Sequence, residues 1–145
     1  MDQIKIDNFS SQHPGCSFPE WDSLSKDACL GISRSIQEKF ALENIPDGLA
    51  LVRAIDAMAQ PCKFTSHVSE DFDLDALLDA CGVDAAEVVY INWYRYDEID
   101  RLKRKDLSDN FDEIWYPGVD DIDIFDDSLS WILSVRHNGY IKILR

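Results

Sequence analysis

The sequence predicts an α+β fold in which N-terminal helices pack on a mostly antiparallel C-terminal sheet of about four to five strands. Two observations lead to this prediction: apolar residues recur at helical spacing up to about residue 82, and they alternate with period two in most of the later segments. The chain has 145 residues, of which 46% are hydrophobic, enough for one ordinary core. Residues 1–145 are therefore expected to form a single domain.

Three helices are predicted in the first part of the chain. The first covers about residues 30–43, where apolar residues follow a helical period. The second begins after Asp47, a good N-cap residue, and ends before Pro61. The third begins at Asp73 and ends at Gly82, because aspartate favours a helix N-cap and glycine favours the residue that follows a helix.

The later segments predict strands and one further helix. Residues 87–96 form a strand that is apolar on both sides, which is typical of a central strand. A helix is predicted over residues 97–105, because acidic residues come first and basic residues last, as the helix macrodipole favours. Asn138 and Gly139 predict a hairpin turn. The remaining strands are expected at about residues 113–116, 121–125, 131–136 and 140–144.

Negative charge is concentrated in residues 106–135, which hold nine acidic residues and no lysine or arginine within a chain of net charge −14. The stretch is too hydrophobic for a disordered acidic tail and too charged for a buried strand, so it predicts a folded acidic surface. In the strand expected here, Asp121 and Asp123 face outward while Ile122 and Ile124 face the core. The prediction is a rigid acidic edge held on a sheet.

An acidic surface of this kind attracts cationic partners. Its carboxylates would set the rate and specificity of association, and its aromatic residues would be the anchors on which affinity depends. The residues predicted to contact a basic protein partner are Asp112, Glu113, Trp115, Tyr116, Asp120, Asp121, Asp123, Asp126 and Asp127.

Other partners and a cofactor are not expected. No apolar run reaches the roughly 18 residues of a membrane span, and no signal peptide is recognisable, so a cytoplasmic protein without membrane contact is predicted. Residues 101–105 are basic, yet tight binding of nucleic acid is not expected in so acidic a chain. No cofactor is predicted.

A metal site is a second possibility considered from the sequence. The run that starts at Asp71 resembles a calcium loop, but Ala76 and Gly82 stand where such a loop needs glycine and glutamate. Asp121 and Asp123 are spaced so that their carboxylates, on one face of a strand, can share a divalent ion. A metal-dependent hydrolase built on these two residues therefore stays open as an alternative.

No motif with a catalytic mechanism is present, so the chain is not predicted to be an enzyme. His13, His67 and His137 are far apart in the sequence, although a cysteine–histidine pair formed in space stays open. The cysteines are widely spaced and are expected to be reduced thiols that serve as small core residues. They are Cys16, Cys29, Cys62 and Cys81.

The segment from Trp115 to Leu133, followed by His137-Asn138-Gly139, resembles the C-terminal part of small acidic bacterial immunity proteins. These belong to contact-dependent growth inhibition and related polymorphic toxin systems, and the resemblance covers about the last 60 residues. It implies a protein that binds a cognate toxin domain, often a nuclease, and neutralises it by occluding its active or substrate-binding site. The alternatives are the metal-dependent hydrolase, an acidic regulatory adaptor for another basic partner, and a housekeeping domain unrelated to toxins.

Overall fold

The computed structural model describes residues 1–69 and 72–145. Asp71, the start of the run that resembles a calcium loop, lies outside the described residues. The helices are α1 (Gln3–Gln12), α2 (Lys26–Lys39), α3 (Leu49–Met58), α4 (Leu74–Ala80), α5 (Arg104–Asp109) and α6 (Phe111–Ile114). The strands are β1 (Trp21–Ser23), β2 (Gln60–Pro61), β3 (Val88–Asn92), β4 (Ile99–Lys103), β5 (Ile122–Phe125), β6 (Ile132–Val135) and β7 (Ile141–Leu144).

The strands form one sheet, in which every described pairing is antiparallel and the order is β1-β4-β3-β5-β6-β7-β2. The α+β class and the antiparallel sheet are thus confirmed. The predicted number of four to five strands is wrong, because the sheet has seven. The two edge strands β1 and β2 have only three and two residues, too few for a period-two pattern to be recognised.

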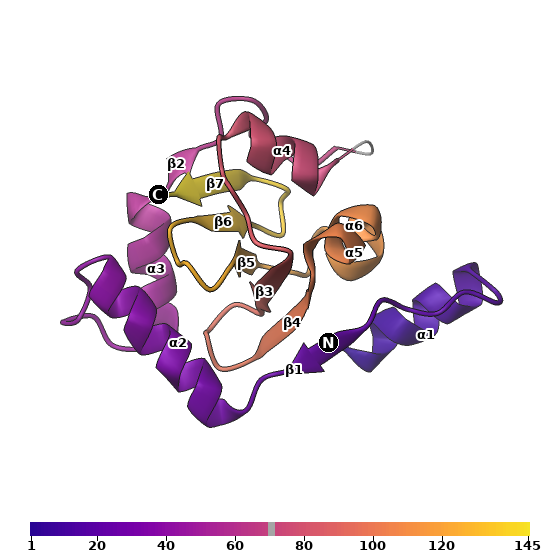
Figure 1. The fold of residues 1–145 in the computed structure, drawn as a ribbon, viewed down its shortest axis with the longest axis horizontal. Coiled ribbons are helices and arrows are strands. Elements are labelled where there is room, and N and C mark those ends of the chain that lie inside the picture. Colours follow the sequence, from indigo (N-terminus) through magenta and orange to yellow (C-terminus); the bar gives the residue numbers. More distant parts are fainter. Residues whose placement is uncertain (70–71) are drawn as a thin grey trace.

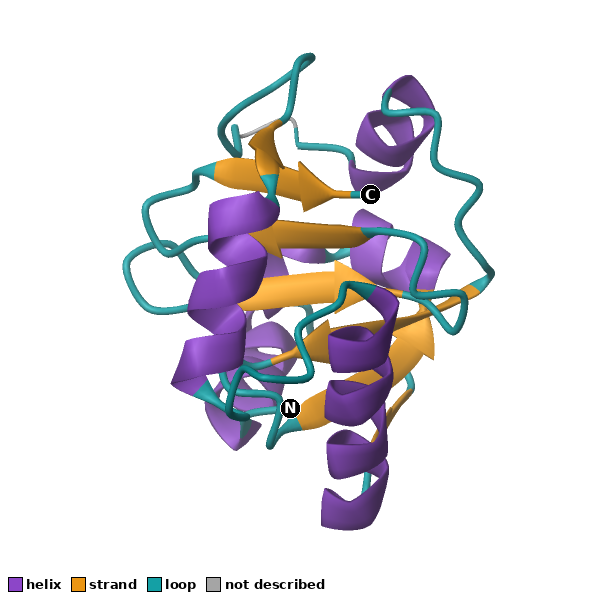
Figure 2. Ribbon diagram, turned by 90° about the vertical axis from the view of Figure 1, so that its left-hand side faces the viewer, coloured by secondary structure: helices purple, strands orange, loops and turns teal. Residues whose placement is uncertain are grey.

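Helices cover both faces of the sheet (Figure 1). The α2 and α3 helices lie on one face, and they stand in front of the strands when the molecule is turned by 90° (Figure 2). The α4, α5 and α6 helices lie on the other face, with α1 beyond them (Figure 1). Two buried apolar clusters correspond to these layers, and every residue of β5 is buried.

Two predicted elements have the wrong secondary structure. The helix predicted over residues 97–105 is instead β4, which pairs with β1 on one side and β3 on the other, and a helix begins only at Arg104. The burial of Ile99 and Leu102 and this double pairing outweigh the charge gradient that suggested a helix. The strand predicted at residues 113–116 is wrong as well, because α6 buries Phe111 and Ile114 there.

The three predicted N-terminal helices agree with the structure to different degrees. Asp73 caps α4 by accepting a hydrogen bond from the Ala76 N–H at 3.0 Å, and Gly82 follows that helix with a φ of +66°. Asp47 does not cap α3, since its carboxylate accepts a hydrogen bond from the Ser33 hydroxyl at 2.7 Å. The first predicted helix is confirmed in part: α2 begins earlier, at Lys26, and ends earlier.

A buried carboxylate lies at the middle of the sheet. Asp123 is fully buried, and its oxygens accept hydrogen bonds from Ser134 at 2.6 Å, Tyr96 at 3.0 Å and Asn92 at 3.2 Å. The Arg136 guanidinium lies 3.1 Å from the same carboxylate. The prediction that Asp123 faces outward is wrong, because β5 is a central strand and helices cover the sheet face to which Asp123 belongs.

Replacing this carboxylate should be costly. Asp123→Ala leaves the guanidinium of Arg136 and three hydrogen-bond donors without their shared acceptor, so we expect the free energy of unfolding to fall by about 3–5 kcal/mol. The measurement is urea unfolding followed by tryptophan fluorescence. The matched control is Asp84→Ala, an exposed aspartate whose side chain has no hydrogen bond within the described residues, and its effect should stay within about 0.5 kcal/mol. Equal effects of the two variants would contradict the structural role of Asp123.

Candidate functional site

The turn between β3 and β4, residues 93–98, has an unusual backbone. Tyr94 and Tyr96 have φ angles of +84° and +63°, a region that costs of order 1–3 kcal/mol for a residue other than glycine. Tyr96 is held there because its N–H donates to the Asn92 side chain at 2.6 Å and its buried hydroxyl donates to Asp123. Tyr94 is 37% exposed and lines a separate cavity with Arg53 and Asp56 of α3. The Asp123 cluster thus determines how this turn is presented to solvent.

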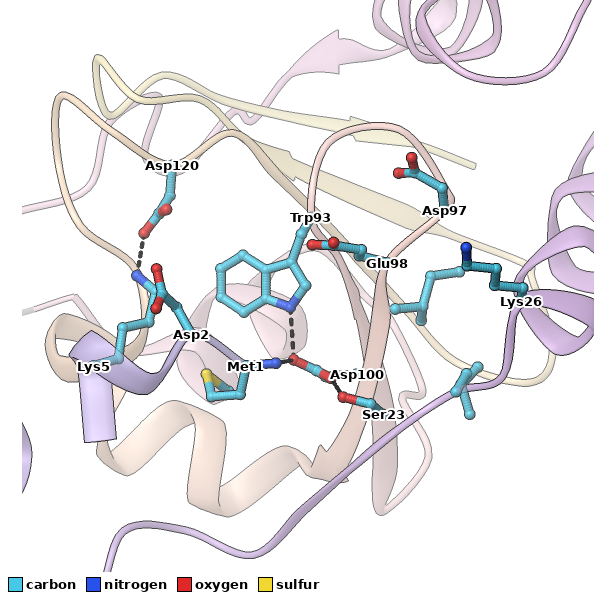
Figure 3. Close-up of a pocket in the computed structure, with 12 residues that line it drawn as sticks. Met1, Asp2, Lys5, Ser23, Lys26, Trp93, Asp97, Glu98, Asp100 and Asp120 are labelled. Carbon is cyan, nitrogen blue, oxygen red and sulfur yellow. Dashed lines mark hydrogen bonds and ion pairs between the residues drawn. The ribbon is translucent and has the colours of Figure 1, made fainter. Parts of the chain in front are cut away.

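A cavity of about 540 Å³ lies beside this turn (Figure 3). We call it the acidic cavity, because five carboxylates line it against two lysines and the amino group of Met1. Lys5 and Lys26 are the lysines, and Trp93 is the aromatic residue in the wall. The carboxylates belong to Asp2, Asp97, Glu98, Asp100 and Asp120.

Asp100 is a structural member of the cavity wall. Its side chain is 2% exposed and accepts hydrogen bonds from the Trp93 indole at 2.8 Å and the Ser23 hydroxyl at 2.5 Å. The amino group of Met1 pairs with the same carboxylate (Figure 3). Asp100 therefore joins β1, the β3–β4 turn and the start of α1, and its charge is already matched.

The second matched charge is Asp120, one of the residues predicted to bind a partner. The Lys5 ammonium lies 2.5 Å from the Asp120 carboxylate and 3.9 Å from the centre of the Tyr116 ring, although Lys5 is only 4% exposed. The Tyr116 N–H donates to the same carboxylate at 2.7 Å. This cation therefore fastens α1 to the segment that follows α6.

Asp97 and Glu98 differ from the other carboxylates of the cavity. Both side chains are exposed, and no hydrogen bond or ion pair of either is found in the described ranges, although Lys26 lines the same cavity. Asp2 is exposed as well, but its carboxylate caps α1 by accepting a hydrogen bond from the Ile4 N–H at 3.1 Å. Asp97 and Glu98 lie on the turn that Tyr96 holds in place, at the side of the cavity away from Lys5 (Figure 3). These two negative charges are available to a ligand or partner in solution.

The predicted partner-binding residues do not form one edge. Asp123, Asp126 and Trp115 are buried, with exposed fractions of 0%, 1% and 4%, so the prediction that they lie on a contact surface is wrong. Helices cover both faces of the sheet, and the turn after β5 encloses Asp126, so these side chains are shielded from solvent. Asp112 and Asp127 are exposed, and the remaining four residues are partly exposed.

The segment around α6 is partly covered by α1. His13 contacts Glu113 at 2.8 Å, and the Asn8 amide donates to the Tyr116 hydroxyl at 3.3 Å. Together with the pair formed by Lys5 and Asp120, these contacts occupy three of the predicted partner-binding residues from within the chain. The sequence offered no signal for this, because α1 was not predicted as a helix.

Asp126 organises the turn between β5 and β6. Its carboxylate accepts hydrogen bonds from the Ala86 N–H at 3.0 Å, the Trp131 indole at 3.0 Å and the Ser128 hydroxyl at 2.5 Å. Burial alone would raise the pKa of Asp126, but the hydrogen bonds from Ser128, Ala86 and Trp131 outweigh burial and lower that pKa. Asp126 is therefore a structural acceptor.

The residues considered for metal binding are not brought together. No group of three or more histidine, cysteine, aspartate or glutamate side chains suited to a metal ion occurs within residues 1–69 and 72–145. Asp121 accepts hydrogen bonds from the backbone and ring of His137 at 2.8 and 3.0 Å, whereas Asp123 is buried beside Arg136. The two carboxylates proposed to share a divalent ion thus have separate partners.

Tyr94, Asp97 and Glu98 were not among the residues predicted to bind a partner. The sequence assigned them to a strand and a helix, because the turn contains no glycine, proline or asparagine, and its aspartate, Asp97, fits the first turn of a helix equally well. In the part of the chain that the structure describes, no helix is long and apolar enough to cross a membrane. Comparisons of the chain with protein-family models, with curated proteins and with solved structures found no match.

The lowered pKa of Asp126 predicts acid sensitivity with a defined sign. The Asp126 carboxyl has a lower pKa in the folded chain than in the unfolded chain, where its pKa is about 3.9. Its contribution to the free energy of unfolding is therefore fully present above the unfolded-state pKa. It is lost as the pH falls through the folded pKa. We expect Asp126→Asn to lower the free energy of unfolding at pH 7 by about 1–3 kcal/mol, and to narrow its difference from the parent below pH 3. Urea unfolding of the parent and the variant from pH 7 to below pH 3 measures both free energies. A difference between them that does not change with pH would contradict the lowered pKa of Asp126.

Proposed function

We propose that this chain is a cytoplasmic immunity protein that binds a cognate cationic toxin domain and blocks its active or substrate-binding site. The observation that carries the proposal is the turn at residues 93–98, which exposes Asp97 and Glu98 at the acidic cavity and Tyr94 at a separate cavity beside α3. The toxin contact is thus proposed at this turn, rather than along the strand that the sequence suggested. The resemblance of residues 115–139 to immunity proteins supports the functional class.

The turn has the properties of a preformed binding element. Its conformation is strained at Tyr94 and Tyr96, and such strain persists where the surrounding structure holds it and recurs at binding sites. The Asp123 cluster supplies that hold by fixing Tyr96. A contact surface that is already ordered loses less conformational entropy on binding, which favours affinity.

Electrostatics support a basic partner. The chain has a net charge of −14, and Asp97 and Glu98 form no ion pair within the described residues, although Lys26 and Arg95 line cavities with them. A nuclease active site must attract phosphate and is therefore usually basic, so an acidic surface is attracted to the same field. Such steering raises association rates towards about 10⁸–10⁹ M⁻¹s⁻¹ at low salt.

The exposed residues of the acidic stretch have a secondary role in this proposal. Asp112 and Asp127 are exposed and Asp121 is partly exposed, at different places around the molecule. They add to the long-range field and so to the rate of encounter, whereas direct contact is assigned to the 93–98 turn. An acidic adaptor for another basic protein would use the same surface, and the identity of the partner distinguishes the two functions.

Removing the two available charges tests the contact. Asp97→Asn with Glu98→Gln should weaken binding to the toxin domain encoded beside this chain by about tenfold or more at roughly 150 mM salt, mainly through faster dissociation. The matched control, Asp84→Asn with Glu87→Gln, removes the same charge from other exposed positions and should change the dissociation constant by less than about threefold. Biolayer interferometry separates the two rates.

Three results of that experiment would contradict the proposal. Equal losses in the two double variants would mean that only net charge matters. Full protection of toxin-expressing cells by Asp97→Asn with Glu98→Gln would show that the turn is not the contact. Absence of a complex with the neighbouring toxin domain, together with binding to an unrelated basic protein, would favour the adaptor.

Tyr94 is expected to be the aromatic anchor. Tyr94→Ala removes the exposed ring from the turn, so we expect the dissociation rate of the toxin complex to rise about 10- to 100-fold while the association rate changes little. Phe64→Ala is the control, because Phe64 is the most exposed large aromatic residue outside the turn, at 67%. A Tyr94 variant that dissociates no faster than the control would place the anchor elsewhere.

A further inference from the structure

Two cysteines that are far apart in the sequence meet in the core. Cys62 directly follows β2, and Cys81 is the C-cap residue of α4. Their sulfur atoms lie 3.0 Å apart, and the residues are 5% and 8% exposed. A disulfide needs a sulfur–sulfur distance of about 2.05 Å, so the two atoms have only about 1 Å left to travel. The sequence prediction treated them as separate small core residues.

The backbone on each side of this pair is fixed. The Cys62 N–H donates to the Ile141 carbonyl of β7 at 3.3 Å, and the Cys81 N–H donates to the Leu77 carbonyl of α4 at 2.9 Å. The Arg145 side chain donates to the Cys81 carbonyl. The backbones that carry the two sulfur atoms are therefore held next to each other by neighbouring elements.

We propose that Cys62 and Cys81 form an oxidisable pair that a peroxide converts into an intramolecular disulfide. The reaction consumes one peroxide: two thiols and hydrogen peroxide give one disulfide and two water molecules. The thiols are oxidised by two electrons and the peroxide oxygen–oxygen bond is reduced. The inference is independent of the proposed function.

Each step assigns a role to one sulfur. Burial, the hydrogen bond with Cys81 and the charge of that neighbour raise the pKa of the Cys62 thiol to about 12, so Cys62 remains protonated at neutral pH. The first attack is assigned to the Cys81 sulfur, which takes one peroxide oxygen as a sulfenic acid while the released hydroxide takes up the thiol proton and becomes water. The Cys62 sulfur then attacks the Cys81 sulfur, and its proton leaves with the hydroxyl as water.

The cross-link would close the loop between residues 62 and 81 and tie α4 to the β2–β7 edge of the sheet. Closing a loop of this size stabilises a chain mainly by restricting its unfolded state. Oxidation is therefore expected to raise the melting temperature by roughly 5–10 °C.

The test uses the full chain with Cys16→Ser, which removes the exposed cysteine that would otherwise form intermolecular disulfides. Of the four cysteines three then remain, and treatment with stoichiometric hydrogen peroxide should reduce the titratable thiols of the denatured protein from three to one. The monomer mass should fall by two hydrogen atoms. Peptide mapping without reductant should show Cys62 joined to Cys81, and a reducing agent should reverse the rise in melting temperature.

Three further variants test which cysteines form the cross-link. Cys62→Ala and Cys81→Ala, each in the Cys16→Ser background, should show no rise in melting temperature with peroxide, whereas Cys29→Ala, which removes a buried cysteine from the other apolar cluster, should keep it. Retention of three thiols in the parent would overturn the proposal. So would a cross-link that involves Cys29, or a gain of oxygen at Cys62 or Cys81 instead of a disulfide.

Discussion

The buried carboxylate of Asp123 is the interaction on which the arrangement of the candidate site depends. It is the shared acceptor for Asn92, Tyr96 and Ser134 and the partner of Arg136, so it links β3, β5 and β6 with the residue that follows β6. A buried charge is stable only when it is paired and hydrogen-bonded, and here the donors come from several strands at once. Because one of them is the Tyr96 hydroxyl, the same cluster holds the strained turn at residues 93–98 in place.

Asp100 and Asp126 repeat this role elsewhere in the sheet. Asp100 joins Trp93 and Ser23 beneath the acidic cavity, and Asp126 joins Trp131 and Ser128 at the other end of β5. An aspartate with several donors can therefore be a structural element in a chain whose composition suggests only an acidic surface. Fewer carboxylates are consequently available to a partner than the number of acidic residues in the sequence suggests. Their positions in the fold decide which ones are available.

Basic residues of α1 and its C-cap pair with part of the acidic surface from within the chain. Lys5 lies between the Asp120 carboxylate and the Tyr116 ring, and His13 reaches Glu113. These contacts occupy part of the surface that the sequence assigned to a partner. They do not involve Asp97 and Glu98, which lie across the acidic cavity from Lys5 and form no ion pair among the described residues. The site thus comes from residues of α1, the β3–β4 turn and the segment after α6.

The sequence by itself determined the α+β class, α3, α4 with its Asp73 cap, and the strands β5, β6 and β7, because these depend on local periodicity and on capping or turn residues. It also determined the net negative charge that favours a basic partner. Only the tertiary structure decided that residues 99–103 pair as a strand, since pairing partners lie far away in the sequence. It also decided that Asp123 is buried, that Tyr94, Asp97 and Glu98 are presented, and that Cys62 meets Cys81. Burial and contact depend on which elements cover a face, and no local pattern carries that information.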